Sequence, residues 1–335
     1  MSGFKAVKFY EKLIKTARIL PTDLLHPYSV QFSPFHSHLL ACCANENYGI
    51  SGSGAIFVFS LQHGTTKRLA WPKGVFDLVW SEEHAALIFG ASADGHVIVF
   101  NAEEEKVVYA RREHDKEVYH IDYSTSRADP PSLLTASWDK TLSVLDPHRP
   151  DLATVRKFRG HDELVYCGVF SPSRSSLLAS TSRDGTLRVW DTRSSSGNAM
   201  VIRAHQAEVL TCDWCKYDDA ILATGATDGL VRVWDLRRPR APVGTLTGHQ
   251  YAVRCVKWSP FVGSHLITCS YDKTVRLWTP MLEAQNGSFQ SAHVMRHHSE
   301  FVYGVDHNLH VPGQLADCSW DRSVKVYRPE SLVSA

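Results

Sequence analysis

The 335-residue sequence lacks any apolar run near the roughly 18–20 residues of a membrane-spanning helix, and no secretory hydrophobic region opens the chain. Its eight cysteines form no dense framework, which favours reduced thiols in a cytosolic compartment. Net charge is almost absent, with 36 Lys and Arg against 35 Asp and Glu. This balance argues against a nucleic acid or another polyanion as the partner. Hydrophobic residues make up 44% of the chain, enough to bury a core.

Common catalytic and metal-binding motifs are also missing. The sequence has no glycine-rich phosphate loop, no nucleophile elbow and no His-Glu-x-x-His, so we expect neither an enzyme nor a bound cofactor. Cys212 and Cys215 have the spacing of half a zinc site, but no second pair of cysteines matches it. His297 and His298 are expected to be one structural histidine beside a surface histidine. We therefore expect no metal site.

A repeat of about 44 residues runs through the chain and accounts for its nine Trp and 18 His. Each copy has a small residue, a variable residue and Asp, followed by an apolar stretch whose last residue stands six positions after the Asp. The copies are marked by Asp94, Asp139, Asp184, Asp228, Asp272 and Asp321. A weaker seventh copy ends at Phe59, with Ser53 in place of the Asp.

A histidine forms a second mark, 23 or 25 residues before five of these Asp residues. These are His114, His161, His205, His249 and His298. Each is followed by a short strand-like run. Strands of five or six residues, separated by Asp-Gly and Asp-Lys turns, are typical of antiparallel meanders, and about 44 residues can hold four of them.

With Gly160-His161 before the strands and Trp190-Asp191 after them, the repeat resembles the WD-repeat family. The resemblance covers about residues 22–330. It implies an all-β fold, a seven-bladed WD-repeat β-propeller that closes radially and forms a single domain over residues 21–332.

The repeated His, Ser and Asp residues allow two interpretations. A set such as His161, Ser182 and Asp184 looks like a catalytic triad, with Ser270 in the corresponding place of the sixth blade. One chain rarely carries five copies of one active site, however. The resemblance implies instead that these residues and the Trp form a hydrogen-bond network holding each blade together.

The segment 1–20 precedes the repeats and has apolar residues at helical spacing with basic residues between them. One interpretation is a basic amphipathic helix for a membrane or a transit segment. We favour the other interpretation, an extension on the propeller edge whose end closes the last blade as its outer strand.

Aligned on WD-repeat geometry, three positions in each copy point to the open face: the third and fifth after the His, and the residue before the Asp. Large aromatic residues dominate these positions, with acidic residues among them, which is typical of a partner site. The candidate peptide-binding residues are Phe76, Asp77, Glu117, Tyr119, Trp138, Leu164, Tyr166, Glu208, Leu210, Tyr271, Tyr303 and Trp320. We infer an apolar, basic peptide, such as an amphipathic helix across the mouth, with the acids setting its register. The alternative is that the aromatics only pack between blades.

Several further segments are not demanded by a propeller. They include Asn47-Tyr48-Gly49-Ile50, Ala204-His205-Gln206-Ala207-Glu208 and Ser319-Trp320-Asp321. Together they resemble the family of WD-repeat receptors for the N-terminal type 2 peroxisomal targeting signal. This resemblance implies a receptor that cycles between the cytoplasm and the peroxisome without stable membrane insertion. The implied partners are cargo proteins such as thiolase, a co-receptor and the peroxisomal docking complex. In that family's pattern, Glu117 and Glu208 fall in the acidic positions.

Two other functions compete with this interpretation. A generic WD-repeat scaffold, for example a substrate adaptor of a ubiquitin ligase, would share the face but bind a different ligand. The second competing function is a hydrolase built on a propeller. Confirmed turnover of any one substrate would support it.

Overall fold

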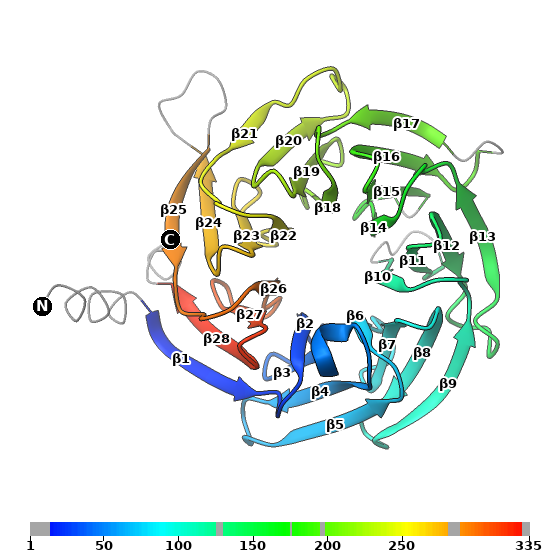
Figure 1. Ribbon diagram of the computed structural model, residues 1–335, viewed down its shortest axis with the longest axis vertical. Coiled ribbons are helices and arrows are strands. Elements are labelled where there is room, and N and C mark those ends of the chain that lie inside the picture. Colours follow the sequence, from blue (N-terminus) through cyan, green and yellow to red (C-terminus); the bar gives the residue numbers. More distant parts are fainter. Residues whose placement is uncertain (1–13, 125–129, 175, 195–197, 281–288, 330–335) are drawn as a thin grey trace, which may run out of the picture.

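The computed structural model describes residues 14–124, 130–174, 176–194, 198–280 and 289–329. These residues form seven four-stranded antiparallel sheets, arranged as blades around a central axis (Figure 1). The expected seven-bladed all-β propeller is confirmed. Apart from the short 3-10 helix η1 (Glu46–Gly49), every regular element in the described parts of the chain is a strand.

Each blade has one strand next to the axis and three further strands toward the rim (Figure 1). The inner strands are β2 (His26–Phe32), β6 (Val75–Trp80), β10 (Val118–Tyr123), β14 (Val165–Phe170), β18 (Val209–Trp214), β22 (Val253–Trp258) and β26 (Val302–His307). The second strands are β3 (Leu39–Asn45), β7 (Leu87–Ser92), β11 (Leu133–Ser137), β15 (Leu177–Ser182), β19 (Ile221–Ala226), β23 (Leu266–Ser270) and β27 (Leu315–Ser319). We number the blades 1 to 7 in this order.

The third and outermost strands complete the blades. The third strands are β4 (Gly54–Ser60), β8 (His96–Asn101), β12 (Thr141–Leu145), β16 (Thr186–Asp191), β20 (Val231–Asp235), β24 (Val275–Pro280) and β28 (Ser323–Pro329). The outer strands are β5 (Thr66–Trp71), β9 (Lys106–Arg112), β13 (Thr154–Arg159), β17 (Asn198–Arg203), β21 (Gly244–Leu246), β25 (Phe289–Met295) and, in blade 7, β1 (Ile14–Pro21). Inner strands such as β6 are buried along their whole length, whereas outer strands such as β9 are largely exposed.

Blade 7 is completed by both ends of the chain. Strand β1 pairs antiparallel with β28, from Ile14 opposite Pro329 to Pro21 opposite Ser323. The backbone N–H of Thr22 then donates to the carbonyl of Arg322. Residues 14–20 are therefore strand, so the helical spacing expected over 1–20 does not hold there, and residues 1–13 lie outside the described part of the chain. No helix in the described ranges is long and apolar enough to cross a membrane.

A hydrogen-bond network of His, Asp, Trp and a Ser or Thr hydroxyl locks blades 4, 5 and 6, and it corrects one expectation. In blade 4, His161 Nδ1 lies 2.8 Å from Asp184 and its Nε2 lies 2.8 Å from the hydroxyl of Ser180, which also accepts from the Trp190 indole. The expected partner, Ser182, instead accepts from the Asp184 backbone N–H. The network therefore uses the hydroxyl two residues earlier on the same face of β15, within reach of both the histidine ring and the indole.

Blade 6 repeats this arrangement with a different hydroxyl. His249 Nδ1 lies 2.8 Å from Asp272, and its Nε2 lies 2.7 Å from the hydroxyl of Thr268 rather than that of Ser270. Burial lowers the pKa of His249 in spite of its carboxylate partner. Burial raises the pKa of Asp272, but the hydrogen bonds from His249, Thr274 and the Gln250 backbone, together with the nearby histidine, lower it below its usual value. These contacts support the structural interpretation of the repeated histidines.

Neighbouring blades are joined by polar side chains of the inner strands. Asp77 accepts a 3.0 Å hydrogen bond from the backbone N–H of Ile121, one blade further on. Asp122, Asp213, Asp306 and Gln31 make the same contact to the next inner strand. Asp77 is 8% exposed. Its carboxylate therefore acts inside the channel, below the open face, and its expected contact with a peptide stays a prediction.

Candidate binding face

One end of the propeller, here called the upper face, carries the Asp turns between the second and third strands and the loops that lead into the inner strands. At its centre lies a closed layer of seven side chains, here called the inner ring. Its members are Tyr28, Phe76, Tyr119, Tyr166, Leu210, Arg254 and Tyr303. Their relative exposures run from 5% to 9%, so this ring caps the channel rather than forming an open surface.

The inner ring corrects part of the sequence-based expectation. Phe76, Tyr119, Tyr166, Leu210 and Tyr303 were expected to present an exposed apolar surface, but they are buried against one another. Tyr119 lies 5.4 Å from Phe76 and 5.7 Å from Tyr166, measured between ring centroids. These five residues therefore pack between blades, as the alternative interpretation expected. A ligand could touch only their upper edges.

A second layer, here called the outer ring, lies half-buried on the inner ring. Its members are Trp138, Leu164, Tyr271, Phe301 and Trp320. Trp138 stacks on Tyr119 at 5.0 Å, and Trp320 stacks on Tyr303 at 4.5 Å. The indole N–H groups of Trp138 and Trp320 have no acceptor within the described ranges. Buried donors of this kind normally find a partner, so these two indoles are exceptions on the upper face.

The two expected acidic residues differ in how they are bound. Glu208 accepts a 2.7 Å hydrogen bond from the Tyr166 phenol and lies 3.0 Å from Arg183 Nε, so its charge is already balanced. The Glu117 carboxylate has neither an ion pair nor a hydrogen bond to any residue the structure describes. Its backbone carbonyl accepts from the Trp138 backbone N–H at 3.0 Å, so the two residues are neighbours on the upper face. Glu117 is thus the available anion of the pair.

The loop of η1 adds exposed apolar residues that lie outside the three aligned face positions of each repeat. Tyr48 is 48% exposed and Ile50 is 87% exposed. Tyr48 lies 3.9 Å from His26 and 4.9 Å from Trp320, measured between ring centroids, and its carbonyl accepts from the Tyr28 phenol. The loop therefore stands directly on both rings. In the sequence, the signal for this loop was the resemblance of Asn47-Tyr48-Gly49-Ile50 to the receptor family.

The backbone of this loop is unusual. Asn47, Tyr48 and Gly49 have φ angles of 44°, 56° and 68°, three successive residues in the left-handed region. A side chain at Gly49 would meet a Phe76 ring carbon at 2.8 Å. Strain held in this way is often found at functional sites, because the surrounding structure must fix it. The loop is a preformed apolar projection at the edge of the mouth.

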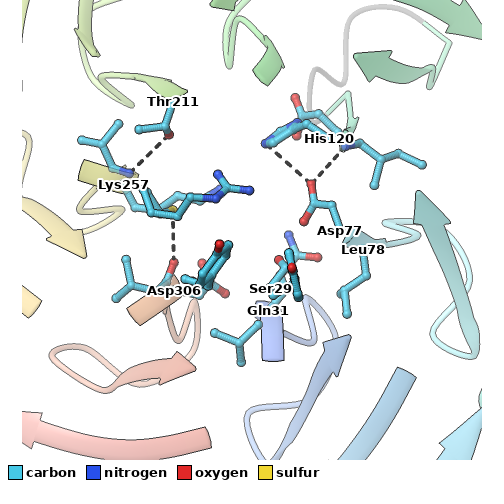
Figure 2. Close-up of a pocket in the computed structure, with 18 of the residues that line it drawn as sticks. Ser29, Gln31, Asp77, Leu78, His120, Thr211, Lys257 and Asp306 are labelled. Carbon is cyan, nitrogen blue, oxygen red and sulfur yellow. Dashed lines mark hydrogen bonds and ion pairs between the residues drawn. The ribbon is translucent and has the colours of Figure 1, made fainter. Parts of the chain in front are cut away.

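Below the inner ring the channel narrows to a cavity of about 50 Å³ lined by charged side chains (Figure 2). Figure 2 shows Asp77 pointing toward His120, whose ring nitrogen lies 3.7 Å from the carboxylate. Burial disfavours the charged form of His120, but Cys167 and Asp77 raise its pKa to about 9. Lys257 faces Asp213 and Asp306, which raise its pKa against the effect of burial. This cavity is too small for a peptide, so the upper face is the better candidate for recognition.

Comparison with known proteins agrees with this architecture. The family described as WD domain, G-beta repeat, matches residues 152–191, 198–235, 240–279 and 289–328. The solved WD40 β-propeller domain of Doa1 superposes with a TM-score of 0.76 at 18% identity, covering 92% of this chain and 95% of that chain. The chain is a seven-bladed β-propeller, and four of its segments match the WD40 repeat.

Curated relatives of this propeller come from animals and a plant. A protein named peroxisomal targeting signal 2 receptor in Mus musculus is 39% identical over 171 residues, covering 50% of this chain and 53% of the relative. The Homo sapiens protein of the same name is 40% identical over 172 residues, covering 49% and 51%. The Arabidopsis thaliana relative, peroxisome biogenesis protein 7, is 41% identical over 131 residues, covering 37% and 41%. In the mouse and human alignments the chain spans about half the length of the curated relatives it matches.

Proposed function

We propose that this WD40 propeller is an import receptor that binds the N-terminal type 2 peroxisomal targeting signal of matrix proteins on its upper face. The observation that carries the proposal is that relatives at 39–41% identity share the receptor name or a peroxisome biogenesis name. The relatives' names point to signal-bearing cargo as the first partner. A co-receptor and the peroxisomal docking complex are the further partners, and the receptor cycles between the cytoplasm and the peroxisome.

The geometry of the upper face suits a basic amphipathic helix. The apolar side of the helix would lie on the outer ring and on Ile50, since burying a Leu-sized side chain contributes about 1.5–3 kcal/mol. Glu117 would pair with a Lys or Arg of the signal and contribute less, about 0.2–1 kcal/mol, because the pair stays exposed. The aromatics therefore set the affinity, and the acid sets the direction of the helix.

The cost of association limits what the propeller achieves alone. Loss of translational and rotational freedom costs at least about 4 kcal/mol, so a short peptide is expected to bind near the micromolar range. A co-receptor that covers the exposed side of the helix would bury more surface and slow its release. This requirement gives the co-receptor a physical role in the proposal.

The test measures the anisotropy of a fluorescent type 2 signal peptide with the purified chain. Glu117→Lys should weaken binding by about fivefold to tenfold, equivalent to about 1–1.4 kcal/mol, because repulsion replaces attraction. Glu104→Lys makes the same charge change on an exposed loop at the opposite face, where Glu104 lies 2.8 Å from Lys106, and should leave binding unchanged. A peptide that binds all three proteins equally, with equal melting temperatures, would overturn the site. Absence of binding with and without co-receptor would overturn the function.

A further inference from the structure

Blade 7 departs from the hydrogen-bond network of the other blades at one position. In blades 3 to 6 the Nε2 atom of the locking histidine lies 2.7–2.9 Å from a neutral hydroxyl. These hydroxyls belong to Thr135, Ser180, Thr224 and Thr268. In blade 7 the corresponding atom, His298 Nε2, lies 2.8 Å from the carboxylate of Asp317. A neutral group has been replaced by an anion that is 0% exposed.

Two more side chains converge on this carboxylate. His297 Nε2 lies 2.8 Å from Asp317 Oδ2, and the Tyr327 phenol donates to the same oxygen at 2.7 Å. His297 is half-buried, so the expectation of a surface histidine beside a structural one is wrong for this residue. Its Nδ1 atom has no partner in the part of the chain that the structure describes. One ligand atom from each of His297, His298 and Asp317 lies within 4.8 Å of the others.

The surroundings of His298 match those of a metal ligand. Its second ring nitrogen, Nδ1, lies 2.7 Å from Asp321, which also accepts from the Ser323 hydroxyl at 2.6 Å. Histidines that bind metals usually donate their other N–H to such a carboxylate, which fixes the ring and strengthens it as a ligand. Asp321 is thus placed to orient His298 from outside the cluster.

We propose that His297, His298 and Asp317 form a binding site for a zinc ion, a site that the sequence did not predict. Two imidazoles and one carboxylate are a donor set that suits zinc, whereas calcium and magnesium prefer sites made only of oxygen ligands. The fourth position would remain for water or for the Tyr327 oxygen. The ion would join the loop between β25 and β26 to strand β27, within the blade that both chain ends complete.

Zinc binding at this site has a defined proton balance. Zinc would take the Nε2 lone pairs of His297 and His298, and the protons now held between these rings and Asp317 would go to solvent. The ligand atoms must move from 2.8 Å apart to about 3.3 Å, as zinc bond lengths of about 2.0–2.2 Å require. Lys325 donates to the His297 carbonyl, so its charge lies near the site and opposes the ion. Because binding releases these protons, the affinity for zinc should fall as the pH drops.

The experiment uses the full chain, stripped with a chelator and then titrated with zinc against a chromophoric chelator. One equivalent should bind, and cobalt in its place should give the intense visible absorption of a tetrahedral site. Asp317→Thr restores the residue type found in blades 3, 5 and 6, so the blade should keep its network while losing a ligand. His297→Gln, at a half-buried position outside the repeated network, removes a second ligand with little risk to folding. Each variant should bind zinc at least tenfold more weakly.

His310→Gln, at an exposed histidine elsewhere in blade 7, is the matched control and should bind zinc as the unaltered chain does. Two results would overturn the proposal. One is an unaltered chain that binds less than a tenth of an equivalent. The other is equal binding by the unaltered chain, Asp317→Thr and His297→Gln, because the ion would then sit on surface histidines. Should Asp317→Thr fail to fold, the result with His297→Gln decides alone.

Discussion

The guanidinium carbon of Arg254 lies 4.8 Å from the ring centroid of Tyr119, across the centre of the inner ring. A second ring, that of Tyr303, lies 5.5 Å away. Arg254 is only 7% exposed, so its charge is largely removed from water. The six equivalent positions in the other blades hold aromatic or aliphatic residues, so one cation closes a channel end that is otherwise apolar.

The charge of Arg254 should not be needed for stability. Cation–π contacts contribute about 0.5–2 kcal/mol, whereas removing a guanidinium from water costs several kcal/mol. We expect Arg254→Met, which keeps the volume, to leave the free energy of unfolding unchanged or to raise it. Urea denaturation followed by Trp fluorescence measures this. A loss of more than about 2 kcal/mol would show that the rings more than offset the cost of burial.

The hydroxyl of Thr268 should matter more than its size suggests. It accepts from the Trp278 indole at 2.8 Å and lies 2.7 Å from His249 Nε2. Thr268→Val removes one oxygen and leaves two buried polar groups without a partner, each at a cost of about 1–3 kcal/mol. We expect unfolding to become easier by about 2–4 kcal/mol in thermal or urea denaturation.

Thr245→Val provides the control for this change, because Thr245 lies exposed on the outer strand of blade 5. Exposed substitutions of this kind usually stay within about 0.5 kcal/mol. Equal stability of Thr268→Val and Thr245→Val would contradict the claim that the hydrogen-bond network stabilises the blade.

The repeat in the sequence was sufficient to predict the fold. The spacing of Asp and His residues fixes four strands in each copy, and the weak copy with Ser53 still forms blade 1 through β4. The strand pattern also places side chains on a face, and the structure stacks Trp138 and Trp320 on the inner-ring residues Tyr119 and Tyr303. Their peptide contacts remain a prediction.

Exposure and pairing could not be predicted in the same way. The channel is narrow enough at its upper end for side chains from seven blades to touch, so Tyr119 and Tyr303 are buried by residues far away in sequence. Glu208 and Glu117 occupy equivalent positions, yet only Glu208 meets an arginine, Arg183. Such contacts depend on the closed ring and on rotamers, which no local pattern encodes.

Asp306 should make stability depend on pH in a direction unusual for a carboxylate. Burial raises its pKa to about 6, even though Lys257 acts in the opposite direction. An unfolded Asp has a pKa of about 3.9, so the folded chain holds this proton at pH values where the unfolded chain has released it. The stabilisation is present below about pH 4 and is lost as the pH rises through 6.

Comparison with Asp306→Asn isolates this effect, because the amide oxygen can still accept from the Phe32 N–H. Between pH 4 and pH 7 the free energy of unfolding of the unaltered chain should fall by about 1–3 kcal/mol relative to that of the variant. Urea denaturation across this range measures both curves. Parallel curves would mean that Asp306 titrates as it does in the unfolded chain.

The loop of η1 should contribute to recognition without contributing to folding. Ile50 is 87% exposed, so Ile50→Ala should change stability by less than about 0.5 kcal/mol. If the signal helix lies on the outer ring, the helix covers Ile50, and each buried methylene contributes about 0.8 kcal/mol. Partial burial then predicts that Ile50→Ala binds the signal peptide about fivefold to tenfold more weakly in the anisotropy assay, a loss of about 1–1.4 kcal/mol.

Leu309→Ala, which removes an exposed side chain from the loop between β26 and β27 at the opposite face, should have no effect on binding. Equal affinities for the two variants would place the helix away from this loop.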